Sequence, residues 1–248
     1  MYRFFVEPAQ MNENRVVISG QDAHHIKNVL RMKCGDCIYI SCGDEWEYTC
    51  RISAFDGRDV VTEIIDMQKT GRELPSEITL YQCMPKKEKM ELIIQKSVEL
   101  GVYRIVPVIS SRCIVKIDPK KSADKTARWN SISKAAAKQA KRLIEPEVTP
   151  AVSFNEALAE ITKNDVAIIP YEKAEGIGAT RKLFQSIEAG QSVGILIGPE
   201  GGFDDKEVKA AVEAGVIPVT LGSRILRTET AGPAVLSILM YLLEEEKN

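Results

Sequence analysis

Histidine is almost absent from this chain of 248 residues, which contains only His24 and His25. A serine–histidine–acid triad needs an imidazole as its base, and histidine metal sites need imidazole nitrogens as ligands. Because no histidine follows residue 25, the C-terminal part of the chain contains neither a nucleophilic triad of this kind nor a histidine metal site.

Long apolar runs are absent as well. No run reaches the roughly 18 consecutive apolar residues that a membrane-spanning helix requires, although 44% of the residues are hydrophobic. The start of the chain, residues 1–8, carries charges and is too short for a signal peptide. We therefore expect a cytoplasmic protein without a membrane segment.

Paired cysteine motifs are also scarce. The six cysteines include a single C-x-x-C motif, Cys34 and Cys37, and no second pair completes a zinc site. Gly35 and Asp36 between them are typical of a turn that enters a strand. We favour reduced structural thiols over a metal or redox site, and we expect no metal.

Net charge is small, at -2, but it is unevenly distributed. Residues 84–142 contain 15 Lys and Arg against 5 Asp and Glu, whereas residues 143–248 contain 9 against 17. A basic block of this kind is typical of a surface that binds a polyanion. A lysine-rich, solvated helix face explains the same charges equally well.

The first part of the chain has short alternating runs separated by turn residues, which predicts a small β-barrel. The runs cover residues 15–19, 37–41, 47–54 and 60–66. Asp22 is expected to cap a short helix over residues 22–30. A linker is expected at residues 70–75, which divides the chain into domains of residues 1–70 and 71–248.

From residue 78 onward, apolar strand-like runs alternate with helical patterns. Strands are expected over residues 78–83, 103–109, 166–169, 193–197 and 216–221, and helices over 87–100, 123–143, 180–188, 204–214 and about 230–245. Asp204 and Glu207 form a capping box, and Pro233 is expected in the first turn of the last helix. This alternation predicts an α/β fold with a mostly parallel sheet covered on both faces.

Two loops near the C-terminus follow apolar strands and lead into helices. The first, residues 198–203, has the sequence Gly-Pro-Glu-Gly-Gly-Phe, and the second covers residues 221–231. Ligands of open α/β sheets bind at the carboxyl ends of strands, where such loops emerge. The first loop lacks the Lys-Ser/Thr pair of a phosphate-binding loop. Taken alone, it is equally consistent with an ordinary tight turn.

The second loop contains three charges within six residues: Arg224, Arg227 and Glu229. Charges between an apolar strand and an apolar helix are costly unless they are paired or used. One interpretation is an ion pair that joins the loops, either Arg227–Glu229 or Arg224–Glu200. The other is that an arginine orients an anionic or carbonyl-bearing substrate while backbone groups hold a cofactor.

The two loops together resemble the RsmE family of 16S ribosomal RNA (uracil-N3) methyltransferases, which belong to the SPOUT class. The resemblance covers nearly the whole chain. Further matching motifs are Arg3-Phe4-Phe5, residues 24–31, Lys89-Met90, Gln95-Lys96, residues 99–101, Pro107 and Arg112. In residues 139–142, Gln139 and Arg142 match the family pattern, whereas Ala140 and Lys141 do not.

The resemblance implies a PUA-like RNA-binding domain, a C-terminal trefoil knot (the alpha-beta knot) and S-adenosyl-L-methionine as cofactor. It implies 16S ribosomal RNA of the small ribosomal subunit as partner. It also implies a homodimer, for which the last helix, with Val235, Leu236, Leu239, Leu242 and Leu243, is a candidate interface; plain core packing is the alternative. The implied cofactor-binding residues are Pro170, Gly198, Pro199, Glu200, Gly201, Gly202, Leu221, Gly222, Ile225, Leu226, Thr230 and Ala231.

Methyl transfer to uridine N3 requires loss of the N3 proton. We expect Arg227 to stabilise charge on a uracil carbonyl, and Glu200 or Glu229 to act as the base or to orient the arginine. A purely structural role for the carboxylates stays open. The expected RNA-binding residues are Arg3, His25, Lys27, Arg31, Lys86, Lys89, Arg112 and Arg142. His24 and His25 are expected to stack on a base or to pack beneath the barrel.

Two other functions fit parts of the sequence. An RNA-binding assembly factor without catalysis would use the first domain and the basic block. The two loops would then have a purely structural role. A nucleotide-using enzyme would bind ATP at the glycine-rich loop, but the missing Lys-Ser/Thr pair argues against it.

Overall fold

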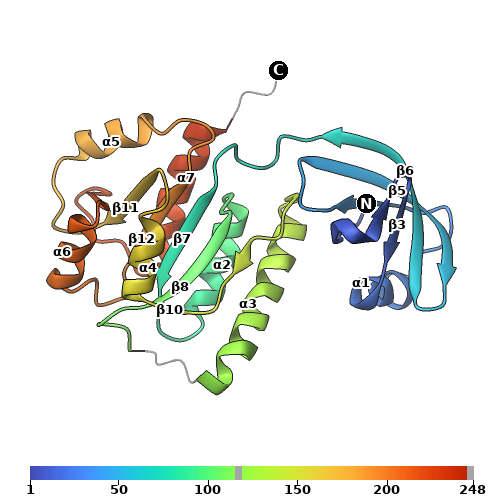
Figure 1. Cartoon of the computed structure of the whole chain (residues 1–248), viewed down its shortest axis with the longest axis horizontal. Coiled ribbons are helices and arrows are strands. Elements are labelled where there is room, and N and C mark those ends of the chain that lie inside the picture. Colours follow the sequence, from blue (N-terminus) through green and yellow to red (C-terminus); the bar gives the residue numbers. More distant parts are fainter. Residues whose placement is uncertain (115–118, 245–248) are drawn as a thin grey trace. The chain divides into compact units, whose positions relative to one another are not determined.

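The computed structural model describes residues 1–114 and 119–244 (Figure 1). It divides into two compact units, of which the first consists of Met1–Glu73 with Ala137–Glu145 and the second of Leu74–Ala136 with Pro146–Asn248. Residues 137–145, which the sequence analysis placed in the larger domain, thus belong to the first unit. They are held there by Lys138, which pairs with Asp22, and by Arg142, which pairs with Glu73.

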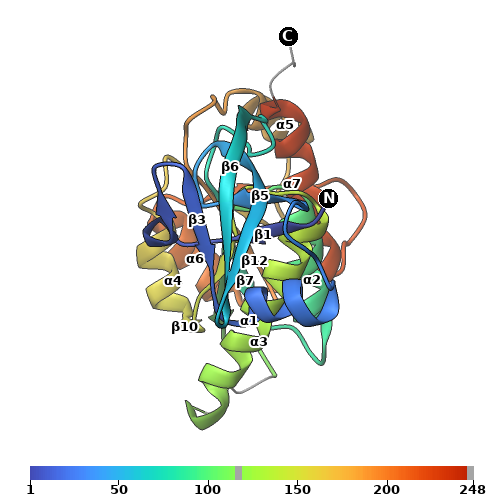
Figure 2. The same cartoon turned by 90° about the vertical axis from the view of Figure 1, so that its right-hand side faces the viewer.

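The first unit contains a six-stranded sheet with the order β1-β4-β5-β6-β3-β2. Its strands are β1 (Arg3–Phe5), β2 (Met11–Asn12), β3 (Arg15–Ile18), β4 (Cys37–Ser41), β5 (Trp46–Asp56) and β6 (Asp59–Lys69). Figure 2 shows β5 and β6 as a long hairpin with β3 beside β6. Alternate residues such as Val16, Ile18, Ile38 and Ile40 are buried in its core, so the β-rich prediction is confirmed. Closure into a barrel stays a prediction.

The short helix of this unit starts earlier than predicted. Helix α1 (Gly20–His24) has Ser19 at its N-cap position and continues as a π-helical turn (His25–Val29). Asp22 therefore lies in the first turn, where a negative charge is favourable, and its carboxylate accepts a 2.8 Å hydrogen bond from Lys138 Nζ. The prediction that Asp22 caps the helix was wrong.

The second unit is built on a parallel sheet with the order β10-β8-β7-β12-β11-β13, and β9 pairs with β8. Its strands are β7 (Ile78–Cys83), β8 (Arg104–Ile109), β9 (Glu147–Val148), β10 (Val152–Ser153), β11 (Val166–Pro170), β12 (Val193–Ile197) and β13 (Ile217–Val219). Its helices are α2 (Lys89–Glu99), α3 (Pro119–Gln139, whose last three residues belong to the first unit), α4 (Phe154–Ile161), α5 (Ile177–Gln185), α6 (Asp205–Glu213) and α7 (Thr228–Leu243).

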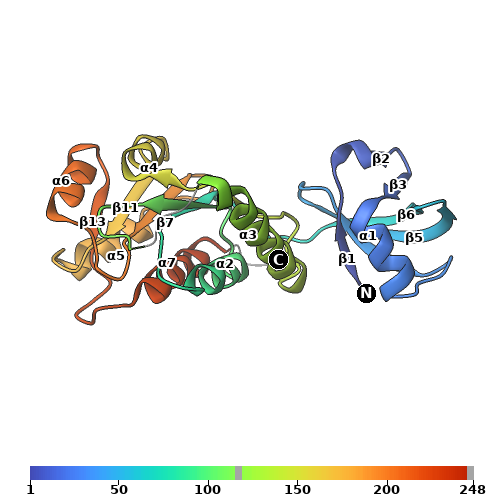
Figure 3. The same ribbon diagram turned by 90° about the horizontal axis from the view of Figure 1, so that it is seen from below.

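Helices cover both faces of this sheet, which confirms the predicted α/β architecture. Figure 3 shows α4 and α6 on one face and α2 and α7 on the other. Tyr81 and Cys83 pack in the cluster that includes residues of α4 and α6. Leu80, one position along β7, faces Gly232 of α7, as the alternation of strand side chains requires.

The capping box of α6 is confirmed: the Asp204 side chain accepts from the amide of Lys206, and Glu207 accepts from the amide of Asp204. The last helix differs from prediction because α7 starts at Thr228, two residues early. Pro233 therefore lies inside the helix instead of in its first turn, and it offers no N–H to the carbonyl of Glu229. The predicted end at Glu245 lies outside the described residues.

No helix within residues 1–114 and 119–244 is long and apolar enough to cross a membrane.

Candidate cofactor and substrate site

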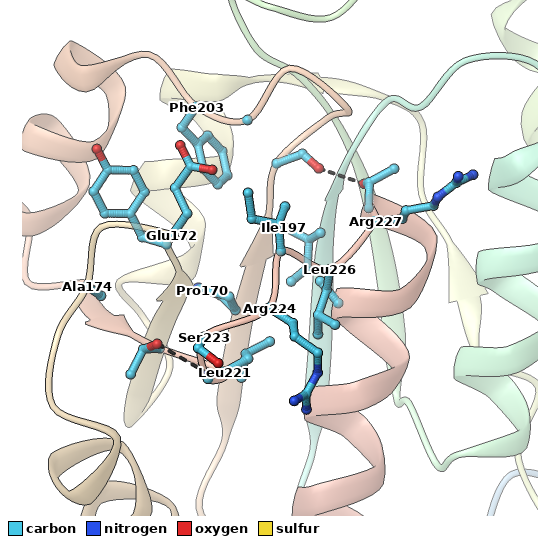
Figure 4. A pocket seen from close by; sticks show the side chains of 18 of the residues that line it. Pro170, Glu172, Ala174, Ile197, Phe203, Leu221, Ser223, Arg224, Leu226 and Arg227 are labelled. Carbon is cyan, nitrogen blue, oxygen red and sulfur yellow. Dashed lines mark hydrogen bonds between the residues drawn. The ribbon is translucent and has the colours of Figure 1, made fainter.

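A pocket of about 970 Å³ lies at the carboxyl ends of β11, β12 and β13. Three loops line it: residues 170–177, 197–203 and 220–228 (Figure 4). The predicted cofactor-binding residues that line the pocket are Pro170, Gly198, Pro199, Glu200, Gly202, Leu221, Gly222, Ile225, Leu226 and Ala231. Gly201 and Thr230 are not among its lining residues. Gly201 instead faces Arg112, whose guanidinium donates to the Gly201 carbonyl over 3.0 Å.

A close approach favours glycine at one position of the first loop. A Cβ on Gly198 would lie 3.1 Å from Phe203 Cε2, which is tighter than ordinary van der Waals contact. The buried Phe203 ring in turn packs edge-to-face against Phe154 of α4, with 6.2 Å between ring centroids. Gly202 and Gly222 have φ angles of 66° and 108°, which L side chains rarely adopt. No atom lies within 4 Å of a Cβ built on either glycine, so their backbones face open space.

A buried hydrogen-bond chain joins the two predicted loops. Gln82 Nε2, at the end of β7, donates to Thr228 Oγ1 over 2.9 Å, and Thr228 Oγ1 donates to the Gly198 carbonyl over 2.6 Å. Gln82 is fully buried and Thr228 is 5% exposed. Gln82 was not predicted as a site residue because a glutamine inside an apolar strand carries no motif signal; its position at a strand's carboxyl end was the available clue.

A lysine joins the same two loops at their rim. Lys89 Nζ, at the start of α2, lies 3.1 Å from Glu200 Oε1 and 3.1 Å from Glu229 Oε2. The amide of Lys86 donates to Glu200 Oε1 over 3.0 Å. Of the predicted arginine pairs, Arg227–Glu229 is long at 4.0 Å, and Arg224–Glu200 does not form among the described residues. The ion pairs that join the two loops are therefore formed by Lys89, and not by an arginine as predicted from the sequence.

The pKa values of both carboxylates lie below their usual range. Burial alone would raise the pKa of Glu200, but its own amide, the amide of Lys86 and the Lys89 ammonium outweigh burial. The pKa of Glu229 is lowered against burial by its own amide, by Lys89 and by Arg227. Conversely, Glu229 and Glu200 raise the pKa of Lys89. All three groups are therefore charged at neutral pH.

Three consecutive or nearly consecutive large side chains of the second loop are exposed to solvent. Arg224 and Arg227 are exposed, and Ile225 between them is 83% exposed. Figure 4 shows the Arg227 side chain pointing away from Pro170 and Glu172. Its side chain is 81% exposed and makes only the long contact to Glu229 among the described ion pairs. The guanidinium is thus available to a ligand that approaches from outside.

The third loop is anchored at the base of α6. Tyr171 Oη donates to Asp205 Oδ1 over 3.0 Å, and Lys173 Nζ donates to the same oxygen over 2.9 Å. The amide of Tyr171 donates to the carbonyl of Val219 in β13 over 3.0 Å. These contacts fix the loop that follows Pro170 beside the other two.

Two of the predicted RNA-binding residues are not available to RNA. Arg3 is buried, and its guanidinium bonds to Glu47 and to Ser41; burial and the neighbouring Arg72 lower its pKa to about 10. Arg142 is also buried, and its Nε donates to Glu73 over 2.9 Å. These predictions were wrong because each guanidinium has a carboxylate partner distant in sequence.

The other predicted RNA-binding residues keep some exposure. His25 is exposed, as is His24, although the His25 ring meets Phe4 edge-on at 6.4 Å. Lys27 Nζ donates to the Gly57 carbonyl over 2.7 Å. Arg31 and Lys86 are exposed. The side chain of Arg112 is 46% exposed even though it contacts Gly201 and Asp204.

Within residues 1–114 and 119–244, no group of three or more His, Cys, Asp or Glu side chains is arranged to hold a metal ion. Cys34 and Cys37 are free thiols, the first exposed and the second half-buried.

The fold and the pocket are those of an α/β enzyme that binds a small molecule at the carboxyl ends of the strands of a parallel sheet. A family model described as an RNA methyltransferase domain matches residues 72–240, and one described as an RNA methyltransferase PUA domain matches residues 18–65. The Bacillus subtilis ribosomal RNA small subunit methyltransferase E is 36% identical over 98% of both chains.

Two structures determined with S-adenosylmethionine are also similar. One is a ribosomal RNA small subunit methyltransferase E from Neisseria gonorrhoeae, with a TM-score of 0.83, 34% identity and 98% coverage of both chains. The other is from Legionella pneumophila, with a TM-score of 0.83, 34% identity and 97% coverage of both chains. The chain belongs to the ribosomal RNA small subunit methyltransferase E family, as its resemblance to the RsmE motifs predicted.

Proposed function

We propose that this protein transfers the methyl group of S-adenosyl-L-methionine to N3 of a specific uridine in 16S ribosomal RNA of the small ribosomal subunit. The observation that carries the proposal is the pocket formed by three loops at the carboxyl edge of the sheet. It lies in a chain that is similar over its whole length to relatives with S-adenosylmethionine bound.

The pocket fits this cofactor chemically. Its walls combine apolar side chains, such as Ile197 and Leu226, with open backbone at Gly202 and Gly222. The adenine ring and the carbon chain of the cofactor need such surfaces, whereas a triphosphate needs cations on a glycine-rich loop. The first loop contains no lysine or arginine, and its single charged residue, Glu200, is paired with Lys89. Pro170, Leu221, Ile225 and the backbone of Gly198 are the residues that we expect to hold the cofactor.

The bound cofactor would supply an electrophilic methyl group. The protein must align uracil N3 with that methyl group and stabilise the charge left when the N3 proton departs. Arg227 is suited to the second task because its guanidinium is exposed at the rim of the pocket. The lowered pKa values of Glu200 and Glu229 make them weak bases, so they fit an orienting role better than proton removal.

Apart from Lys89, the predicted basic side chains that keep some exposure are the proposed RNA contacts. They are His25, Lys27 and Arg31 in the first unit, and Lys86 and Arg112 in the second. Phosphate contacts of this kind release counterions, so RNA affinity should fall as salt rises. Placement of one unpaired base in the pocket would supply the specificity.

A trefoil knot and a homodimer complete the proposal. The loop at residues 220–227 connects β13, at one edge of the sheet, to α7, which packs on β7 and β12 in the middle of the sheet. A knotted path of the chain would explain how the three loops meet there.

For the dimer, most residues proposed from the sequence are unsuitable as interface residues, because Val235, Leu236, Leu239 and Leu243 are buried within the unit. The exposed apolar residues of α7 are Ile238, Tyr241 and Leu242.

Calorimetry with S-adenosylmethionine and with ATP tests the cofactor assignment. We expect binding of S-adenosylmethionine with micromolar affinity and no binding of ATP. Methylation of isolated small subunits and of free 16S ribosomal RNA, followed by mass spectrometry of the nucleosides, tests the reaction. The absence of 3-methyluridine in both, with intact RNA binding, would instead support an assembly factor without catalysis.

A further inference from the structure

Lys89 is the only described side chain that forms ion pairs with both the first and the second loop of the pocket. Its ammonium lies 3.1 Å from a carboxylate oxygen of Glu200 in the first loop and 3.1 Å from one of Glu229 in the second. Lys89 also lines the pocket. It stands at the first position of α2, so it belongs to neither loop.

Without the lysine, the two carboxylates would repel each other. The two carboxylate oxygens that face Lys89 can be no more than about 6 Å apart, because each lies 3.1 Å from its nitrogen. The side chain of Glu229 is only 15% exposed and that of Glu200 is 24% exposed, so water screens them incompletely. A cation between them converts the repulsion into a link between the loops.

Buried hydrogen bonds provide a second connection between the two loops. Gln82, seven residues earlier, is hydrogen-bonded to Thr228, which in turn bonds to Gly198. The segment of residues 82–89 thus contacts the second loop at a buried neutral group, through Gln82, and both loops at rim charges, through Lys89. The Lys86 amide adds a further bond to Glu200.

We propose that Lys89 is a positioning residue that holds the loops of residues 198–203 and 221–231 in their cofactor-binding arrangement, and that it does not contact RNA phosphate. The proposal rests on the proposed function, because its readout is affinity for S-adenosylmethionine. Lys89 acts through Glu200 and Glu229 and leaves Arg227, whose contact to Glu229 is longer, free to meet the substrate.

The test compares Lys89→Met with wild type by calorimetry with S-adenosylmethionine in the absence of RNA. Because exposed and half-exposed ion pairs are individually weak, we expect cofactor affinity to fall about three- to tenfold. Lys89→Arg keeps the cation and should restore most of this loss. Lys209→Met, which removes a similar Lys–Glu ion pair from α6, is the matched control and should bind the cofactor normally.

RNA binding separates this role from a phosphate contact. For Lys89→Met we expect unchanged RNA affinity and an unchanged slope of log affinity against log salt. A phosphate contact would lower the RNA affinity and reduce that slope by about one. That result, together with normal cofactor affinity, would overturn the proposal.

The pH dependence adds a readout that simple destabilisation would not move. In wild type, cofactor affinity should persist at acidic pH until the carboxylates, whose pKa values are lowered, become protonated. In Lys89→Met no link is left for protonation to break, and protonation relieves the repulsion between the two carboxylates, so the acid limb should be lost. An acid limb that persists in a folded variant contradicts the proposal.

Two further results keep the outcomes distinct. If Lys89→Met does not fold, Glu200→Gln replaces it, because this variant leaves Lys89 with one partner. It should show the same loss of cofactor affinity, and normal affinity would overturn the proposed positioning role. If wild type itself does not bind S-adenosylmethionine, the proposed function fails, which is a different result from a normal Lys89→Met variant.

Discussion

The buried arginines of the first unit show why a charged residue that has a buried partner is not available to bind a ligand. Arg3 pairs with Glu47, which is itself 1% exposed and also meets Arg72 and Gln68. A buried charge is tolerated when it is paired with an opposite charge, and removal of one partner is far more costly than the pair is worth. Arg3 and Glu47 therefore specify the packing of this unit, and neither is free to bind a ligand.

Cys113 is the thiol whose chemistry we expect to differ from that of an ordinary cysteine. Hydrogen bonding from Cys83 and from Ser110 lowers the pKa of Cys113 to about 6, while burial raises the pKa of Cys50 to about 11. Thiolates are the reactive form. The rate at which iodoacetamide alkylates Cys113 should therefore be half of its maximum near pH 6 and close to its maximum at pH 7.

Mass spectrometry of the cysteine peptides across a pH series measures this reactivity site by site. Cys50 serves as an internal control that should stay unmodified at pH 7. If Cys113 reacts appreciably only above pH 8, the thiol is protonated at neutral pH and the prediction fails. Ser110→Ala, which removes the hydroxyl 3.3 Å from the sulfur, should move the midpoint upward.

At the scale of elements, the site depends on contacts between the end of β7, the start of α7 and the first loop. Thr228→Val keeps the shape of the side chain but removes its hydroxyl. The Gly198 carbonyl and one N–H of the buried Gln82 then lack a partner. Leaving such groups unsatisfied costs about 1–3 kcal/mol, so the free energy of unfolding should fall by that amount.

Urea denaturation, monitored by circular dichroism, checks this expectation. Thr228→Ser retains the hydroxyl and is the control that should stay close to wild type. A Thr228→Val variant as stable as wild type would show that the hydroxyl chain contributes nothing to stability.

Local signals in the sequence predicted the elements well. The strand at residues 193–197 and the capping box of Asp204 and Glu207 were correct because apolar runs and caps act over a few residues. The start of α7 was wrong by two residues because Thr228 is held by Gln82, a partner 146 positions away. The ion pairs of Lys89 could not be predicted for a similar reason: a lysine in a basic block does not reveal carboxylates far along the chain.

At the scale of the whole molecule, the exposed apolar face of α7 predicts self-association. Ile238, Tyr241 and Leu242 lie at helical spacing and are 41%, 82% and 40% exposed, and Leu92 on the adjoining α2 is 46% exposed. Contiguous exposed apolar side chains on one face are typical of an interface. We expect a dimer in solution, and Tyr241→Asp should shift it to monomer.

Size-exclusion chromatography with light scattering measures the mass directly. Tyr103→Asp, which changes a 41% exposed tyrosine in the connection between α2 and β8, is the control that should remain dimeric. A monomeric wild type, or a Tyr241→Asp variant that stays dimeric, would place the interface elsewhere or exclude it.

The return of residues 137–145 to the first unit has a consequence for synthesis. Arg142 and Glu73 are 69 positions apart, and most of the intervening chain belongs to the second unit. As the chain leaves the ribosome, the six-stranded sheet emerges complete while the segment that carries Lys138 and Arg142 has yet to be translated. During that interval Glu73 and Asp22 lack these partners, so the first unit finishes folding only after part of the second has been made.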